Sequence, residues 1–209
     1  RISFDAGQTL YEANDPIRTV YFPNQAMVSL VSIMEDGSTT EIGLVGNEGM
    51  LGLPAIWGGD YTPNHTIVQI ASSAMRLRAD VLKREFNRGE DLQRLILRYT
   101  QALFIQVGQN AACNRHHTIK DRLARWLLSV HDCVQQNELP LTQELIGNML
   151  GIRRSSVTVA ASILQQGGMI RYSRGRITLQ NREALEATAC ECYRLIQQEY
   201  HRLLGSRRN

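Results

Sequence analysis

Residues 142–167, TQELIGNMLGIRRSSVTVAASILQQG, constrain the fold more than any other stretch of this chain. Their apolar positions recur at helical spacing on either side of Gly151, which predicts two short helices joined by a tight turn. Gly147 is small where two such helices would cross, and Thr142 and Ser155 can cap their first turns. The pattern predicts a helix-turn-helix, whose first helix rests on phosphates and whose second enters the major groove of DNA.

The charged residues are distributed unevenly between the two halves of the chain. Residues 1–110 contain 9 basic and 12 acidic residues, whereas residues 111–209 contain 14 and 8. A mildly acidic half followed by a basic half fits a sensing or scaffold domain joined to a nucleic-acid-binding domain. Because the predicted helix-turn-helix lies in the basic half, both observations indicate double-stranded DNA as the partner.

The composition is that of a globular protein with a sizeable core. The chain has 209 residues, of which 43% are hydrophobic, enough for one large domain or two ordinary ones. No apolar run approaches the roughly 20 residues of a membrane span, and no basic-then-apolar segment marks export. Four cysteines without regular spacing favour reduced thiols. We therefore expect a cytoplasmic protein that does not act in a membrane.

Residues 1–80 have the pattern of short β-strands. Apolar segments of strand length alternate with turn signals roughly every ten residues, which is typical of a closed barrel or roll. Asp36-Gly37 is a strong hairpin signal in the middle of this region. A short helix is expected over residues 79–87.

From about Gly89 the apolar period changes to that of a long helix. Steps of three and four separate its apolar residues, which are Leu92, Leu95, Ile96, Tyr99, Leu103, Val107 and Ala111. Leu97, Phe104 and Ile105 add apolar groups on a second side. One face can cover the β region, whereas the other needs a partner, most simply the same helix of a second chain. We predict a parallel homodimer through residues 90–113.

The residues around the helix-turn-helix complete a winged DNA-binding domain. Thr118 can cap a preceding helix, with Asp121 in its first turn. Residues 169–180 predict a β-hairpin that turns at the tripeptide SRG, and such a hairpin directly after a recognition helix is a wing. Residues 182–204 predict one last amphipathic helix.

In this order, the β region, the long helix and the winged helix resemble the Crp–Fnr superfamily of bacterial transcription regulators. The resemblance is most specific in residues 142–159 and in the wing, and it extends to the segment GLVGNEGMLGLPA at residues 43–55. It implies an α+β fold with an N-terminal β-roll like a cyclic-nucleotide-binding domain, a dimerisation helix and a winged helix-turn-helix. The expected boundaries are residues 1–88, 89–114 and 115–209, the last with an extra C-terminal helix.

The resemblance also implies partners. A dimer would bind a two-fold symmetric operator and alter the recruitment of RNA polymerase. The effector of the β-roll is left unidentified by the sequence.

The segments that match the family's effector pocket lack its usual chemistry. Where the cyclic-AMP-binding members carry Gly-Glu-Leu, this chain has Gly49, Met50 and Leu51, so an apolar side chain replaces the ribose-binding carboxylate. The segment that matches the phosphate-binding arginine holds His65 and Thr66 and no arginine. A buried phosphate without a cation is strongly disfavoured, so cyclic AMP is not expected. These five residues are the candidate pocket residues.

The recognition helix is expected over residues 155–166. The resemblance assigns Arg154 at its start to a guanine, since an arginine fork bonds O6 and N7 together. Ser155 and Val159 stand where the cyclic-AMP receptors use Glu and Arg, which predicts a different half-site with Thr158 or Val159 against a thymine methyl. Phosphate or minor-groove contacts are expected from Gln143, Arg153, Ser156, Arg174 and Arg176.

Cysteines and histidines occur in two separate places. Cys113 and His116 have metal-ligand spacing at the end of the long helix, beside His117, but no third or fourth ligand is near in sequence. Cys190 and Cys192 are two apart within the predicted last helix and should point to different sides. The first 112 residues contain no cysteine for an iron–sulfur cluster. We expect neither a metal nor a cofactor.

No catalytic motif stands out, since a P-loop, a nucleophile elbow and HExxH are all absent from the sequence. We therefore expect no enzymatic activity. The leading hypothesis is a homodimeric, sequence-specific transcription regulator whose activity is set through the β-roll. The alternative is a β-roll that senses a small molecule, joined to a basic half that binds nucleic acid or protein without sequence choice. Salt dependence and competition with random DNA separate the two.

Overall fold

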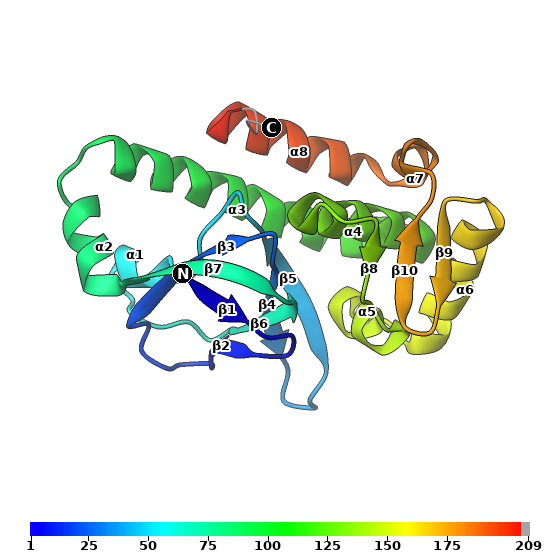
Figure 1. The fold of residues 1–209 in the computed structure, drawn as a ribbon, viewed down its shortest axis with the longest axis horizontal. Coiled ribbons are helices and arrows are strands. Elements are labelled where there is room, and N and C mark those ends of the chain that lie inside the picture. Colours follow the sequence, from blue (N-terminus) through cyan, green and yellow to red (C-terminus); the bar gives the residue numbers. More distant parts are fainter. Residues whose placement is uncertain (206–209) are drawn as a thin grey trace.

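The computed structural model describes residues 1–205 and consists of an N-terminal β-roll, a long helix and a C-terminal helical part (Figure 1). This order of parts confirms the predicted α+β fold class. Within residues 1–205, no helix is both long and apolar enough to cross a bilayer.

Two antiparallel sheets form the β-roll. The first contains, in spatial order, β1 (Ile2–Phe4), β7 (Ser72–Arg78) and β3 (Thr19–Asn24). The second contains β2 (Thr9–Tyr11), β6 (His65–Ile70), β4 (Met27–Ile33) and β5 (Thr39–Val45). The predicted hairpin turn at Asp36 and Gly37 joins β4 to β5, and Gly37 adopts a φ of +80° that side chains disfavour. Apolar side chains such as Phe4, Val20 and Val68 fill the interior.

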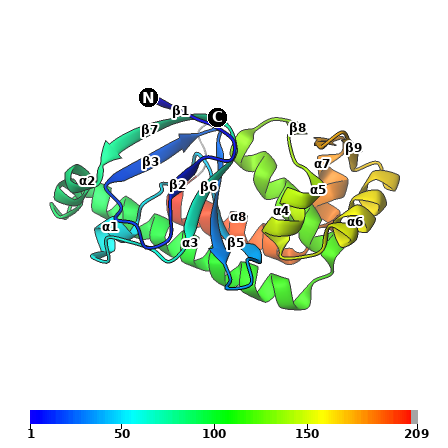
Figure 2. The ribbon, with the colours of Figure 1, turned by 90° about the horizontal axis from the view of Figure 1, so that it is seen from below.

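Helix α3 (Asp91–His116) runs along the β-roll and continues past it, with α8 (Glu191–Leu204) beside it in both views (Figures 1 and 2). The short helices α1 (Pro54–Trp57) and α2 (Ala79–Phe86) precede α3. Tyr99 and Leu103 of α3 belong to the core of the roll. On another side of the helix, Gln106 Nε2 donates a hydrogen bond to Tyr200 Oη of α8 at 3.2 Å. The chain's own C-terminal helix therefore covers a further side of α3, while Leu97 and Phe104 on the predicted dimer face stay exposed.

The C-terminal part combines helices with a small antiparallel sheet. Its helices before α8 are α4 (Ile119–Val134), α5 (Gln143–Leu150), α6 (Arg154–Gln166) and α7 (Arg182–Thr188). Its strands, in spatial order, are β8 (Glu138–Leu139), β10 (Arg176–Leu179) and β9 (Ile170–Ser173). Thr118 and Thr142 cap α4 and α5 as predicted, because the Asp121 and Leu145 amides donate to their hydroxyls.

Two local predictions in this part are wrong. Helix α6 begins at Arg154 with Arg153 at its N-cap, so Ser155 lies inside the first turn and does not cap it. The single helix predicted over residues 182–204 is interrupted, because Ala189 and Cys190 have extended backbone angles. Residues 182–204 contain no glycine or proline, so the sequence has no signal that predicts this break.

The β-roll and the C-terminal part share an apolar core and a buried carboxylate. Met27 and Leu44 of the roll pack with the side chains of α4. Glu41 of β5 is buried at the same junction, where Trp126 Nε1 of α4 donates to its Oε1 at 2.9 Å and Ser29 Oγ donates to its Oε2 at 2.5 Å. Burial raises the pKa of Glu41 to about 7, against the lowering effect of these hydrogen bonds.

Replacing Glu41 with glutamine should weaken the pH dependence of stability. The folded chain holds the Glu41 proton up to about pH 7, whereas an ordinary glutamate releases it near 4.5. The contribution of the Glu41 carboxyl to the unfolding free energy is therefore fully present below about pH 4.5, and it is lost as the pH rises through 7. Between pH 5 and 8 the wild type should lose roughly 2.5 kcal/mol more unfolding free energy than Glu41→Gln, at about 1.4 kcal/mol per pKa unit.

Urea unfolding at the two pH values measures this difference. The exposed Glu35→Gln in the same hairpin is the control and should keep the wild-type pH dependence. Identical pH dependence in the wild type and Glu41→Gln would contradict the raised pKa.

Candidate nucleic-acid interface and ligand sites

The two helices of the helix-turn-helix meet at Gly147, as the sequence predicts. A Cβ at this position would lie 2.9 Å from the Ile152 carbonyl oxygen and 3.7 Å from Val157 Cγ2. Gly151 ends α5 with a φ of +62°, and its left-handed conformation turns the chain toward α6. The angle between α5 and α6 is therefore fixed by close backbone contact.

Helix α6 presents a face of exposed side chains at its N-terminal end. Arg153, Arg154 and Ser155 are exposed there, and Val159 exposes 62% of its surface one turn further on. Thr158 Oγ1 donates to Gln143 Oε1 of α5 at 2.8 Å, so one candidate on each helix is joined by a hydrogen bond. Ser156 is half-buried, at the edge of this face. The structure thus gathers the candidates predicted on α5 and α6 onto one surface.

The wing carries the remaining two candidates. Strands β9 and β10 form the predicted hairpin, with positive φ at Arg174 and Gly175 in its turn. Arg176 pairs with Glu138 of β8 through Nη1 and Oε1 at 2.5 Å. Among residues 1–205, no carboxylate pairs with Arg153, Arg154 or Arg174, so these guanidinium groups are available to an anionic ligand.

The turn of the helix-turn-helix touches the β-roll. A Cβ at Gly151 would lie 2.8 Å from Thr40 Oγ1 at the start of β5. Nearby, Gln69 of β6 donates a hydrogen bond to the Met149 sulfur of α5 at 3.6 Å. These contacts place α5 and the turn that follows it directly against β5 and β6 of the β-roll.

An apolar cavity of about 430 Å³ lies between the β-roll and α3. None of its lining residues carries a formal charge, and they include Met50, Leu51, Thr66, Leu97 and Phe104. A cavity with this lining suits an uncharged, mainly apolar ligand, since an anion would find no cation in it.

The other two candidate pocket residues lie outside this lining. His65 Nδ1 is 2.8 Å from Glu12 Oε2, at the edge of the roll. Gly49 packs under Tyr99, because a Cβ at Gly49 would collide with the Tyr99 ring and its oxygen. The Tyr99 hydroxyl donates to the Met50 carbonyl at 3.1 Å, which holds this glycine-rich segment against α3. Gly49 therefore shapes the wall behind the cavity.

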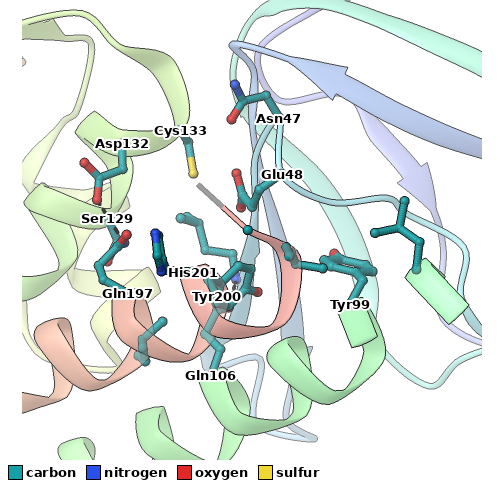
Figure 3. Close-up of a pocket in the computed structure, with 15 residues that line it drawn as sticks. Asn47, Glu48, Tyr99, Gln106, Ser129, Asp132, Cys133, Gln197, Tyr200 and His201 are labelled. Atoms are coloured by element: carbon teal, nitrogen blue, oxygen red, sulfur yellow. Dashed lines mark hydrogen bonds between the residues drawn. The ribbon is translucent and has the colours of Figure 1, made fainter. Parts of the chain in front are cut away.

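A second, more polar cavity of about 450 Å³ opens between α3, α4, α8 and the loop after β5 (Figure 3). Asp132 of α4 accepts hydrogen bonds from Arg182, Tyr193 and Gln197, at 2.9, 2.8 and 2.9 Å. Glu48 Oε1 accepts the Gly46 amide at 3.1 Å. The sequence gives no sign of this cavity, because four segments far apart in the chain contribute to it.

Three cysteines and one histidine from the C-terminal end of α3 and the N-terminal end of α8 lie close together. The thiol sulfurs of Cys113, Cys190 and Cys192 and a ring nitrogen of His117 all lie within 4.8 Å of one another. The expectation that Cys190 and Cys192 point apart is wrong, because Cys190 is the extended N-cap of α8 rather than a helical residue. The hydrogen bond from Cys190 lowers the pKa of Cys113 to about 5 and raises that of Cys190 itself.

Two family models match the chain. The cyclic nucleotide-binding domain matches residues 1–88, and the Crp-like helix-turn-helix domain matches residues 121–188. The global nitrogen regulator of Synechocystis is 22% identical over 193 residues, which span 88% of this chain and 85% of that protein.

Solved structures share the fold at low identity. A CRP-family transcriptional regulator from Thermus thermophilus is 20% identical with a TM-score of 0.74, covering 90% of this chain and 96% of its own. FixK2 from Bradyrhizobium japonicum is 18% identical with a TM-score of 0.75 and the same coverage. The arrangement of β-roll, long helix and helix-turn-helix is therefore common to these proteins.

Gly147→Ala should destabilise the helix-turn-helix. The added methyl group would press on the Ile152 carbonyl oxygen, and overpacking of this kind costs about 1–3 kcal/mol. Thermal or urea unfolding measures the loss. The neighbouring exposed position serves as control, since Asn148→Ala should change stability by less than about 0.5 kcal/mol. Equal stability of the two variants would show that the helices separate easily at Gly147.

Proposed function

The chain belongs to the Crp–Fnr superfamily of transcription regulators, and on that premise we propose that it binds a two-fold symmetric operator as a homodimer. Its Crp-like helix-turn-helix makes it a DNA-binding transcription regulator. The homodimer and the operator are proposed from the outward-facing stripe of α3 and from Arg153 and Arg154 at the start of α6, with which no carboxylate among residues 1–205 pairs. We propose RNA polymerase as the partner on promoter DNA from the family resemblance alone, and no enzymatic activity.

The proposed dimer seam is the exposed stripe of α3. Leu97, Gln101, Phe104, Gly108 and Ala111 are spaced by alternating steps of four and three, the heptad spacing of a parallel coiled coil. Leu97 exposes 51% and Phe104 77% of their surface. Exposed large apolar groups at heptad spacing on a helix favour burial against an identical helix.

The proposed DNA contacts follow from the surface of α6. Arg154 stands at the helix start, where its guanidinium can bond guanine O6 and N7 together. Val159 and the methyl group of Thr158 lie on the exposed face, where they suit a thymine methyl. Arg153, Gln143, Ser155, Ser156 and the wing arginines surround these positions and are proposed to hold phosphates.

The proposed input is an uncharged ligand in the apolar cavity. Leu97 and Phe104 line this cavity and also belong to the proposed seam. A ligand bound there would alter the packing of the two α3 helices and could shift the spacing of the recognition helices, since each α3 leads directly into its α4. Gly49, Met50, Leu51 and Thr66 remain the proposed walls of this site, with His65 at its outer edge.

Phe104→Glu should dissociate the dimer. The change removes two buried aromatic rings per dimer and places two like charges at the seam, so the dissociation constant should rise at least about a hundredfold. Analytical ultracentrifugation across a concentration series measures this. Leu95→Glu makes the same kind of change at an exposed apolar residue on the side of α3 that faces α8, away from the heptad stripe, and should leave the dimer intact. A wild-type chain that sediments as a monomer at micromolar concentration would refute the proposed seam.

Selection of bound fragments from a random DNA pool tests the proposed function. The wild type should enrich a palindrome whose half-sites are about one helical turn, roughly 34 Å, apart. If the protein needs its effector, the palindrome should emerge only when uncharged small molecules are added. Salt-sensitive binding to all fragments under every condition would instead support the nonspecific binding module.

Arg154→Ala should then lose specificity on the selected operator. Affinity for the operator should fall by about 1–3 kcal/mol, while binding to random DNA changes little. Arg153→Ala is the matched control, because a phosphate contact should weaken operator and random DNA alike. Equal losses on both DNAs for Arg154→Ala would show that Arg154 also contacts phosphate only.

A further inference from the structure

Three cysteines and a histidine form a compact cluster at the turn between α3 and α4. Cys113 lies in the last turn of α3 and His117 caps its end, directly before the Thr118 N-cap of α4. Cys190 caps the start of α8 and Cys192 lies in its first turn. Cys113 and Cys192 are completely buried, so the cluster is enclosed between the ends of three helices.

The separations between the ligand atoms fit one metal ion. Cys113 Sγ lies 3.5 Å from Cys190 Sγ, and Cys192 Sγ lies 3.5 Å from His117 Nδ1. Metal–ligand bonds of about 2.0–2.3 Å at the tetrahedral angle separate neighbouring ligand atoms by roughly 3.5–3.8 Å. An iron–sulfur cluster attaches its cysteines to different iron atoms and needs wider spacing than the 4.8 Å limit found for all four atoms.

The groups around the four ligand atoms are those that orient metal ligands. His117 Nε2, the nitrogen turned away from the thiols, lies 3.1 Å from Glu191 Oε2. A histidine that ligates a metal commonly donates its other ring N–H to a carboxylate in this way, which fixes the tautomer. Gln109 Nε2 donates to Cys192 Sγ at 3.1 Å, as amides do to metal-bound thiolates.

Two buried arginines supply charge that matches such a site. Three thiolates and a neutral imidazole around a divalent cation carry one net negative charge. Arg122 and Arg125 of α4 are both buried, and Arg125 exerts an electrostatic attraction on Cys113. Among residues 1–205, the Nε atom of neither arginine has a hydrogen-bond partner. A negatively charged centre beside them would offset the cost of burying two guanidinium groups.

We propose that Cys113, His117, Cys190 and Cys192 bind one zinc ion in a tetrahedral Cys₃His site. The ion ties the start of α8 to the end of α3 and fixes the hinge through which α3 leads into the DNA-binding part. Four protein ligands leave no open position, so the site is structural rather than catalytic. The proposal is independent of the operator and effector proposed above, because it concerns metal content and helix attachment.

Metal analysis of the full chain, purified under reducing conditions after growth with zinc, tests the proposal. We expect about one zinc ion per chain. After chelation, titration with Co²⁺ should produce thiolate-to-metal charge transfer and the intense visible bands of a tetrahedral ion, and zinc should displace them. The wild type alone gives this result, so it does not depend on the folding of any variant.

Matched variants identify the ligands. His117→Ala and Cys113→Ser should lower zinc affinity at least tenfold. His116→Ala, exposed and adjacent in sequence, and Cys133→Ser, buried outside the cluster, should bind zinc as the wild type does. Glu191→Ala removes the carboxylate behind His117 and should weaken binding about 10- to 100-fold.

Hydrogen exchange tests the attachment of α8. Chelation should speed exchange at residues 191–204 while leaving α5 unchanged, and zinc should reverse it. Four results would overturn the proposal: a wild type that binds neither zinc nor Co²⁺, iron with acid-labile sulfide in the purified chain, unchanged affinity in His117→Ala and Cys113→Ser, or unchanged exchange in α8.

Discussion

Helix α3 carries apolar side chains around most of its circumference, and the rest of the structure is arranged to bury them. Tyr99 and Leu103 complete the core of the β-roll on one side. Helix α8 covers a second side, and Leu97 and Phe104 face outward on a third. Because a helix of 26 residues moves as a rigid rod, a change of packing on one side of α3 shifts the contacts on its other sides. In our proposal this helix connects ligand, dimer seam and recognition helices.

The position of the DNA-binding part depends on more than its connection to α3. Glu41 of the roll and Trp126 of α4 hydrogen-bond within a shared apolar core. A buried carboxyl with directional partners favours one docking geometry over others, at a cost in desolvation. Thr40 also touches the turn at Gly151. A rearrangement of the recognition helices relative to the roll must break or shift these contacts together.

The local features of the C-terminal part were predictable because local interactions decide them. The caps at Thr118 and Thr142 and the left-handed turn at Gly151 depend on atoms within a few residues. The break at Ala189 and Cys190 was not predictable, since the apolar stripe continues through it without glycine or proline. Packing of α8 along α3 sets the chain direction there, and a pattern of apolar residues carries no information about that direction.

By itself the sequence determined the helix-turn-helix, its wing, the resemblance to the Crp–Fnr superfamily and the absence of a phosphate-binding arginine from the segment that matches the family's effector pocket, because residue type and spacing along the chain suffice for these. Only the tertiary structure decided that α8 returns to α3, that the apolar cavity borders the outward stripe of α3, and that Glu41 meets Trp126. The tertiary structure also places the Cys113 thiol 3.5 Å from the Cys190 thiol, although the two residues are 77 apart in the chain. Contacts between distant segments depend on how helices and sheets pack in space, and spacing along a single chain cannot specify that packing.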